Sequence, residues 1–408
     1  MLEKTKVSVI GQGYVGQTLA VGAAEAGYIV VGFDLNSALI TNLINRRSFV
    51  PGVTQEKLNQ IIEKGQFLPT DNPELIKDSE IIVIAVPTPI DEARNPDLTF
   101  VIKACESINK YASSPALIIS ESTSYPGTLR NVIKPILEKN SNTRFEYAVA
   151  PERVDPGNEK WNLGNTTRVI SGLTDSATNK AISFYSNFCQ NIYRAASPEV
   201  AEAAKLLENS FRQVNIALVN EFSNIMSSLD ISANEVVEAA SSKPFGFMKF
   251  LPSIGVGGHC IPVDPEYLTY FARSKGISSP LIDTANEINF KRPTQVIDSI
   301  EKYLGFKLIG KRIQIVGIAY KSGVVDIRES PAIELILKLR NIGATVNWHD
   351  PVVKMWQGEE STPLDPSVDL GLIITPHSEI DLSVWRNTKT TVLDLSATSQ
   401  NLGWPRIL

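Results

Sequence analysis

The feature that most constrains the fold is a glycine-rich turn near the N-terminus, GQGYVG at residues 11–16. It follows a β-branched run at 7–10 and opens a stretch with helical spacing, and a second apolar run at 29–33 ends in Asp34. Glycines so spaced permit a tight turn and close approach of a pyrophosphate to the helix N-terminus. GxGxxG alone is a weak signal. It predicts a dinucleotide-binding unit here because a strand precedes it, a helix follows it and Asp34 ends the next apolar run.

Cofactor contacts are expected from this turn and from neighbouring strand ends. The Asp34 carboxylate can accept hydrogen bonds from both ribose hydroxyls and would repel a 2′-phosphate, which favours NAD over NADP. Thr88 in VPTP and Thr123 in EST follow further strand-like runs, and ligands bind at the carboxyl ends of such strands. Each threonine, taken alone, is also compatible with a local turn or cap. The predicted cofactor-binding residues are Gly11, Gly13, Tyr14, Val15, Gly16, Asp34, Thr88 and Thr123.

Short apolar runs alternating with helix-length segments predict an α/β chain. The runs at 7–10, 29–33, 81–86, 117–120 and 147–150 indicate an N-terminal doubly wound Rossmann domain with a parallel sheet. Ser197-Pro198 then opens one long amphipathic helix, and Lys291-Arg292-Pro293 indicates a boundary. From Lys311 a strand, a helix and a second strand ending in Asp350 predict a C-terminal Rossmann-like domain without GxGxxG. The predicted domains are 1–196, 197–293 and 294–408.

Composition excludes several classes of protein. With 39 basic and 44 acidic residues, the net charge of −5 lacks the basic surplus of a nucleic-acid-binding protein. The three cysteines, Cys105, Cys189 and Cys260, are too far apart to indicate a disulfide framework or a zinc site, so we expect no metal. The chain has neither a signal-peptide pattern nor an apolar run of membrane-spanning length, and we expect a cytoplasmic protein that does not bind membranes.

The segment GVGGHCIPVDP at 255–265 carries the strongest chemical signal. Three glycines in four positions allow a ligand to approach the backbone, and Cys260 follows them with a carboxylate, Asp264, four residues on. A cysteine beside a histidine is by itself more often structural than catalytic, since cysteine is a good small core residue. Its significance depends on what accompanies it.

Polar residues elsewhere in the chain could act together with Cys260. Lys205, Asn209 and Arg212 form a polar stripe on the long helix, which is compatible with a solvated face or with residues that stabilise an oxyanion and order water or substrate. Glu152, in APERVDPG, directly follows a strand and so lies at the carboxyl end of the predicted sheet.

These motifs, in this order, make the chain resemble the UDP-glucose/GDP-mannose dehydrogenase superfamily over nearly its whole length. The matching segments are GQGYVG, VPTP, EST, PER, KLLENSFRQVNIALVNE, GVGGHCIPVDP, and GIAYK followed by DIRESPA. The resemblance implies an N-terminal NAD-binding domain, a central helical dimerisation region and a C-terminal UDP-sugar-binding domain. It also implies NAD as the cofactor and a homodimer formed through the long helix.

The resemblance assigns roles motif by motif. The nucleophile falls on Cys260 and the catalytic lysine on Lys205, supported by Asn209, Asp264, Glu152 and Thr123. Lys321 in AYK and Arg328 in DIRESPA match the contacts to the substrate nucleotide. The complete predicted substrate-binding set is Glu152, Arg153, Lys205, Asn209, Arg212, Gly257, His259, Lys321 and Arg328.

One departure concerns the substrate. UDP-glucose and GDP-mannose enzymes usually read GGSCFPKD or GGSCLPKD, whereas this chain has His259 in place of the serine and Val263 in place of the lysine. GGHCIPVDP resembles the branch that acts on UDP-N-acetylglucosamine or UDP-N-acetylmannosamine, so the implied reaction is oxidation of the C6 alcohol of a UDP-N-acetylhexosamine to the carboxylate.

Three alternatives stay open at this point. A UDP-glucose 6-dehydrogenase would share the other motifs and differ in the loop around Cys260. A two-electron β-hydroxyacid dehydrogenase also joins a Rossmann domain to a long helix with Lys and Asn, but gives Cys260 no role. A non-catalytic NAD sensor would tolerate loss of Cys260, Lys205 and Asp264.

Overall fold

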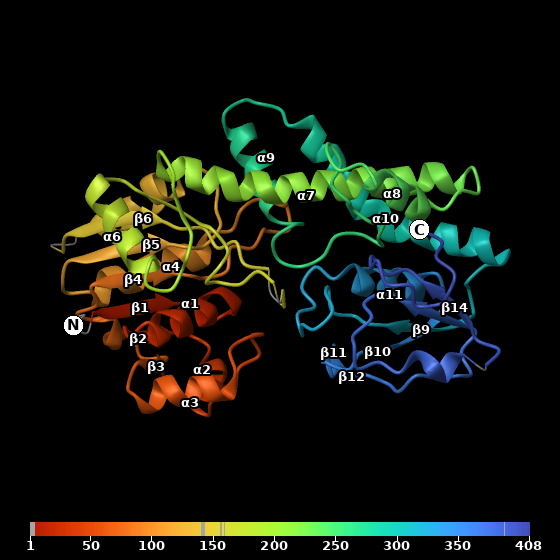
Figure 1. The fold of residues 1–408 in the computed structure, drawn as a ribbon, viewed down its shortest axis with the longest axis horizontal. Helices are drawn as coiled ribbons and strands as arrows, with labels where there is room; N and C mark the ends of the chain where they lie inside the picture. The colour runs from red at the N-terminus through yellow and green to blue at the C-terminus, as the bar shows by residue number, and fades with distance from the viewer. Residues whose placement is uncertain (1–4, 140–142, 156, 159, 387) are drawn as a thin grey trace. The chain divides into compact units, whose positions relative to one another are not determined.

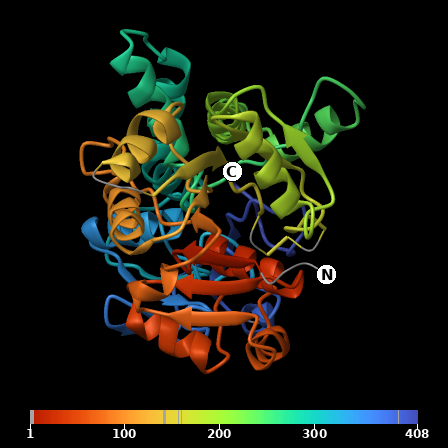
Figure 2. The same ribbon diagram turned by 90° about the vertical axis from the view of Figure 1, so that its left-hand side faces the viewer.

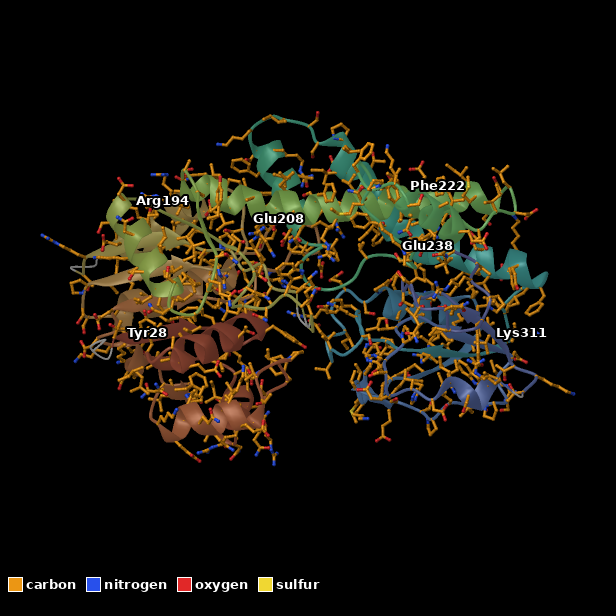
Figure 3. All side chains as sticks on the ribbon, viewed as in Figure 1. Tyr28, Arg194, Glu208, Phe222, Glu238 and Lys311 are labelled. Atoms are coloured by element: carbon orange, nitrogen blue, oxygen red, sulfur yellow. The ribbon has the colours of Figure 1, made fainter. Side chains whose placement is uncertain are left out.

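A computed structural model describes residues 5–139, 143–155, 157–158, 160–386 and 388–408. The chain divides into two compact units: unit 1 runs up to Glu208 and includes 266–275, and unit 2 comprises 209–265 and 276–408. Helix α7 (Pro198–Ser227) belongs to both, because the division falls after Glu208, which Figure 3 labels.

Unit 1 is built on one twisted sheet with strand order β3-β2-β1-β4-β5-β6-β7-β8 (Figures 1 and 2). The chain starts in the middle of the sheet and builds outward first to one side and then to the other, which confirms the predicted doubly wound domain. The strands are β1 (Lys6–Ile10), β2 (Ile29–Phe33), β3 (Phe67–Thr70), β4 (Ile81–Ile84), β5 (Ala116–Ser120), β6 (Phe145–Val149), β7 (Arg168–Gly172) and β8 (Ile192–Arg194).

Helices cover both faces of this sheet. On one face, apolar side chains of one set of helices and of alternate strand residues form one buried cluster. On the other face, a second set of helices and the remaining strand residues form another buried cluster. Val9 and Ile10 of β1 belong to different clusters, because successive side chains of a strand point to opposite faces. The first set is α1 (Tyr14–Glu25), α2 (Ser37–Ile44), α3 (Gln55–Glu63) and α6 (Asp175–Tyr185), and the second is α4 (Thr99–Tyr111) and α5 (Lys134–Glu138).

The five strands predicted from the sequence all pair in parallel, whereas β3, β7 and β8 were not identified there. β7 runs antiparallel to β6, with Val149 opposite Ser171. Among the described residues between these two strands there is no helix, and a parallel return requires a crossover of helix length. The antiparallel return brings Arg168 of β7 to the end of β6 that carries the candidate site.

Unit 2 contains a second, parallel sheet with order β10-β9-β13-β14, which confirms the predicted C-terminal Rossmann-like domain. Apolar residues of α10 and α11 pack on it in one buried cluster. The elements are β9 (Arg312–Val316), α11 (Pro331–Asn341), β10 (Thr345–His349), β13 (Leu370–Ile373), β14 (Thr391–Asp394) and the short hairpin β11 (Met355–Trp356) and β12 (Glu359–Glu360).

The remaining helices are α8 (Ala233–Ser241), α9 (Asp264–Ser274) and α10 (Pro280–Leu304). Within unit 2, amide side chains join α7 to α10: Asn220 donates to Asn289 at 3.2 Å and Asn224 donates to Gln295 at 3.1 Å. Paired amides satisfy their own hydrogen bonds inside the interface, so they fix the register of the two helices more narrowly than apolar contacts would.

α10 continues through Lys291-Arg292-Pro293, the segment at which the sequence predicts a domain boundary. Pro293 cannot donate to the carbonyl of Asn289. The buried side chain of Arg292 compensates by donating to the carbonyl of Ser253 at 2.9 Å and to Ser223 Oγ at 3.1 Å, so tertiary contacts hold the helix across the proline. No helix in the described part of the chain is long and apolar enough to cross a membrane.

Candidate active site

The glycine-rich turn of unit 1 leaves space where a dinucleotide would bind. Gly11 has φ +94°, and a Cβ there would lie 2.5 Å from the carbonyl oxygen of Ala85. A Cβ on Gly16 would overlap the carbonyl of Gly11, which explains the close packing of α1 on β1. A Cβ on Gly13, in contrast, would meet no described atom within 4 Å. Gly11 and Gly16 therefore shape the turn, while Gly13 keeps its outer side open.

The N-terminus of α1 is suited to an anion. Its N-cap is Gly13, and no described side chain caps it. Uncapped N–H groups and the helix dipole favour a negatively charged group there, so the turn fits a pyrophosphate. Tyr14 and Val15, also predicted to bind the cofactor, form the first residues of this helix.

Asp34 lies just past the end of β2 and is partly exposed. Its Oδ2 accepts the N–H of Gln12 at 2.7 Å, and its Oδ1 accepts the N–H of Asn36 at 2.9 Å. These bonds fix the carboxylate beside the glycine-rich turn, and each oxygen retains a lone pair for a ribose hydroxyl. The residues present thus fit the dinucleotide that the sequence predicts.

Thr88 and Thr123 follow β4 and β5, which are adjacent in the sheet. The two turns are tied together because Ser122 Oγ donates to the carbonyl of Val86 at 2.8 Å. Thr88 is buried and Thr123 is partly exposed. Thr123 is therefore the better placed of the two to contact a ligand.

Glu152 and Lys205 are both buried in unit 1, and the charge of Lys205 acts on the Glu152 carboxylate. Glu152 Oε1 accepts the N–H groups of Arg153 and Val154, each at 2.6 Å, and its Oε2 accepts from Arg168 at 3.0 Å. Burial alone would raise the pKa of Glu152, but the charge of Arg168, these N–H groups and the charge of Lys205 together lower it. Glu152 is therefore held as a fixed anion.

Arg153, predicted to contact substrate, is engaged within unit 1. Its Nη2 lies 2.6 Å from Glu208 Oε1, and its Nη1 donates to the carbonyl of Thr167 at 2.7 Å. These bonds hold its side chain against α7 and the segment before β7.

Three predicted catalytic residues come together in unit 2. Cys260 is exposed at the end of the glycine loop. The N–H of Asp264, at the start of α9, donates to the Cys260 carbonyl at 2.8 Å, and the buried Asp264 carboxylate accepts from Asn209 Nδ2. Asn209 lies four residues after Lys205 on the continuous helix α7, which gives these two positions the same helical face. Arg212 on the same helix is exposed.

The glycines before Cys260 let its loop lie against the AYK segment. A Cβ on Gly258, which has φ +84°, would come within 2.9 Å of the Tyr320 ring, and a Cβ on Gly257 would lie 2.7 Å from Pro331 Cδ. The Gly258 N–H donates to the carbonyl of Arg328 at 3.1 Å. Gly257 and Gly258 are therefore required by close packing inside unit 2.

His259 lies in a largely buried position next to Arg328. Burial, followed by the positive charge of Arg328, lowers the pKa of His259 to about 4, although Asp326 opposes this shift. The imidazole is thus neutral at pH 7. Arg328 itself is half exposed and pairs with Asp326, with Nη2 and Oδ2 2.6 Å apart.

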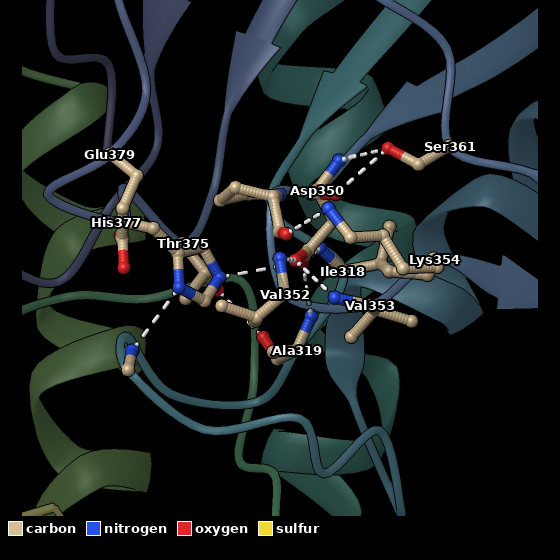
Figure 4. A network of polar contacts seen from close by, with 12 residues as sticks. Ile318, Ala319, Asp350, Val352, Val353, Lys354, Ser361, Thr375, His377 and Glu379 are labelled. Atoms are coloured by element: carbon tan, nitrogen blue, oxygen red, sulfur yellow. Dashed lines mark hydrogen bonds and ion pairs between the residues drawn. The ribbon is translucent and has the colours of Figure 1, made fainter.

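The segment that carries Lys321 is anchored by a buried pair, Asp350 and His377 (Figure 4). Asp350 Oδ2 accepts the N–H groups of Ile318 at 2.8 Å and Ala319 at 3.1 Å, and it lies 3.4 Å from His377 Nε2. His377 Nδ1 accepts the N–H of Gly323 at 3.1 Å. Both sides of Lys321 are therefore fixed by side chains from the segments that follow β10 and β13.

Sequence reasoning missed Arg168, Glu121, Asp350 and His377. A charged residue beginning an apolar run, as in TRVISG, was an available signal for Arg168, since such a residue must be paired when buried. No comparable local signal marks His377. Among the described residues, no group of three or more His, Cys, Asp or Glu side chains is arranged to bind a metal.

Comparison with known proteins agrees with this arrangement. The UDP-glucose/GDP-mannose dehydrogenase family models match in three consecutive parts: the NAD binding domain at 5–196, the central domain at 199–291 and the UDP binding domain at 314–397. The chain belongs to the UDP-glucose/GDP-mannose dehydrogenase family. The predicted family and the predicted NAD cofactor are thereby confirmed.

Relatives in this family are similar over most of their length. A UDP-N-acetyl-D-glucosamine 6-dehydrogenase of Pseudomonas aeruginosa is 34% identical over 86% of this chain and 84% of its own. The solved UDP-D-ManNAc dehydrogenase of Pyrococcus horikoshii has a TM-score of 0.86 at 29% identity, with 99% of both chains covered. A solved UDP-glucose dehydrogenase of Pyrobaculum islandicum has the same TM-score at 25% identity, with 98% of both chains covered. The similarity of the fold therefore does not distinguish relatives named for UDP-glucose from those named for UDP-N-acetylated sugars.

Proposed function

We propose that this chain oxidises the C6 alcohol of a UDP-N-acetylhexosamine to the carboxylate and consumes two NAD⁺ per sugar. The observation that carries the proposal is the exposed Cys260 in the GGHC loop, joined through Asp264 to Asn209. Two-electron dehydrogenases have no need for such a cysteine. Relatives named for UDP-N-acetylated sugars support the substrate class.

The side chains of this protein account for the chemistry as follows. Bound NAD⁺ supplies the hydride acceptor for both oxidations. The Cys260 thiolate attacks the aldehyde carbon to form a thiohemiacetal, loss of the second hydride leaves a thioester, and water cleaves it to the acid and free Cys260. Lys205 stabilises the oxyanion formed at that carbon. The ionised Glu152 holds the Lys205 charge in place.

Substrate contacts are proposed for unit 2. Lys321 and Arg328 supply positive charge for the diphosphate, and the fixed segment around Lys321 limits the entropy lost on binding. Asn209 and Asp264 position water or the reacting oxygen near Cys260. The neutral His259 can donate one hydrogen bond and accept another, which suits the acetamido group at C2.

We also propose a homodimer formed through α7 and a cytoplasmic location. Large apolar side chains of α7 are exposed at intervals of seven or four residues, as expected for a helix that packs on another copy. They are Val200, Leu207, Phe211, Leu218 and Ile225. Cys105, Cys189 and Cys260, all among the described residues, are thiols that form no disulfide, which suits a reducing compartment.

The decisive experiment measures NADH and sugar product together for UDP-GlcNAc, UDP-ManNAc, UDP-glucose and GDP-mannose. We expect two NADH per uronate and faster turnover of an N-acetylated sugar. One NADH per substrate would indicate a two-electron dehydrogenase, and none would indicate an NAD sensor. Equal or faster turnover of UDP-glucose would contradict the proposed substrate class.

A further inference from the structure

Unit 1 buries a cluster of ionisable side chains at the carboxyl edge of its sheet. It consists of Glu121 after β5, Glu152 after β6, Arg168 at the start of β7 and Tyr185 at the end of α6. The side chains of Arg168 and Glu121 are 3% and 0% exposed. Charged groups are retained in such positions only when they are paired and hydrogen-bonded.

Arg168 is the centre of the cluster. Its Nη2 donates to Glu152 Oε2 at 3.0 Å, and its Nη1 lies 3.5 Å from Glu121 Oε1. The guanidinium carbon lies 5.0 Å from the centroid of the Tyr185 ring, and Nη1 also donates weakly to the carbonyl of Ala150 at 3.4 Å. One planar cation thus links carboxylates from two adjacent strand ends, a task suited to the fork of an arginine and not to the single ammonium of a lysine.

The two carboxylates are held differently. Glu152 accepts three strong hydrogen bonds, two from backbone N–H groups and one from Arg168. Glu121 Oε1 accepts from the Tyr185 hydroxyl, while Glu121 Oε2 is buried and has no hydrogen-bond partner among the described residues. A buried carboxylate oxygen without a donor is unfavourable, whereas a protonated one is less so.

Electrostatics agree with this asymmetry. Burial raises the pKa of Glu121 to about 7; the charge of Arg168 opposes the rise, and the charge of Glu152 adds to it. The other titratable groups facing the cluster stay neutral near pH 7, because burial raises the pKa values of Tyr185 and Cys189. Lys205 faces the cluster from α7 through Glu152, whose pKa is lowered. Near neutral pH, Glu121 is the member of the cluster that titrates.

We propose that Arg168 is a positioning residue that fixes Glu152 as an anion beside Lys205, and that Glu121 carries the exchangeable proton of the cluster. This deepens the proposed function and rests on it for its effect on turnover. Arg168 contacts neither substrate nor cofactor in this assignment. Its removal would leave Glu152 free to protonate and Lys205 without a fixed counter-charge.

The test compares Arg168→Gln and Arg168→Lys with Arg194→Gln. Arg194 lies in the same unit, on β8, and pairs with Asp175 at the surface, so its replacement matches the loss of charge without touching the cluster. For Arg168→Gln we expect kcat to fall at least about tenfold, with the KM for NAD⁺ changed less than about threefold. The acid limb of the kcat profile should move to higher pH, because Glu152 loses its stabilising cation. Arg168→Lys should recover part of both effects, and Arg194→Gln should match the parent.

An infrared titration makes the proton assignment independent of turnover. We expect a protonated-carboxyl signal that disappears with a midpoint near pH 7, is absent in Glu121→Gln and persists in Glu152→Gln. Loss of the signal in Glu152→Gln alone, or an unchanged pH profile in both folded Arg168 variants, would overturn the inference. If the parent protein oxidised no nucleotide sugar, the proposed function would fail, while the titration would still decide which carboxyl carries the proton.

Discussion

Replacing Gly11 and Gly13 separately with alanine distinguishes the structural from the ligand-related role of the glycine-rich turn. In Gly11→Ala the new Cβ would lie 2.5 Å from the Ala85 carbonyl oxygen, at φ +94°. The left-handed conformation costs roughly 1–2 kcal/mol and the overlap roughly 1–3 kcal/mol, so the free energy of unfolding should fall by about 2–5 kcal/mol.

Gly13→Ala should behave differently. Gly13 has φ −73° and ψ −162°, which alanine adopts readily, and its Cβ would meet no described atom within 4 Å. Its effect on unfolding should stay within about 0.5 kcal/mol. The methyl group would nevertheless occupy the space next to the uncapped end of α1, so the Kd for NAD⁺ should rise at least about tenfold.

Thermal unfolding without ligand and calorimetric titration with NAD⁺ measure the two effects separately. At roughly 2–4 °C per kcal/mol for a domain of this size, Gly11→Ala should lower Tm by about 4–20 °C. The reasoning would be refuted if Gly13→Ala lost as much stability as Gly11→Ala. It would equally be refuted if Gly13→Ala bound NAD⁺ as tightly as the parent.

Three further predictions concern individual side chains. Cys260→Ser should still bind NAD⁺ and substrate but lose uronate formation, since a hydroxyl is far less nucleophilic than a thiolate; product analysis showing two NADH per uronate at the parent rate would exclude the covalent route. Asp34→Ala should narrow the preference for NAD⁺ over NADP⁺, measured as a ratio of kcat/KM, and an unchanged ratio would remove Asp34 from the ribose site. His259 has a folded-state pKa below its unfolded value, so its contribution to stability is present above pH 6.5 and is lost toward pH 4. Unfolding by denaturant at several pH values should give a shallower acid-side decline for His259→Gln, and equal slopes would contradict the burial argument.

The features of the fold and the site that could be predicted are those determined by residues close together in the sequence. The turn at 11–16 is a local feature, because Gly11 and Gly16 are needed by contacts at the ends of β1 and β4 that any such turn makes. The Cys260 loop was recognisable for the same reason. The fold class followed from the alternation of apolar runs, since each run needs a place in a sheet.

The parts that could not be predicted depend on residues distant in the chain. Glu121 and Arg168 are 47 positions apart, and only the antiparallel return of β7 brings them together. Pro293 is tolerated inside α10 because Arg292 reaches Ser253, a contact that local helix rules do not contain. Such contacts arise from topology, which a single sequence specifies only indirectly.

Asp34 and Asp350 occupy the same position in the two sheets, just past the strand that pairs with the first strand of each βαβ unit. Gly11 and Gly317 correspond in the same way, each donating its N–H at 2.8 Å to the last residue of that neighbouring strand. Asp34 is partly exposed, but Asp350 is completely buried under backbone N–H groups and His377. Asp34 can therefore be replaced, in evolution or by engineering, when the ligand changes. Replacement of Asp350 would disrupt folding. Exchange of Asp34 should therefore be a workable way to alter nucleotide preference, whereas exchange of Asp350 should yield insoluble protein.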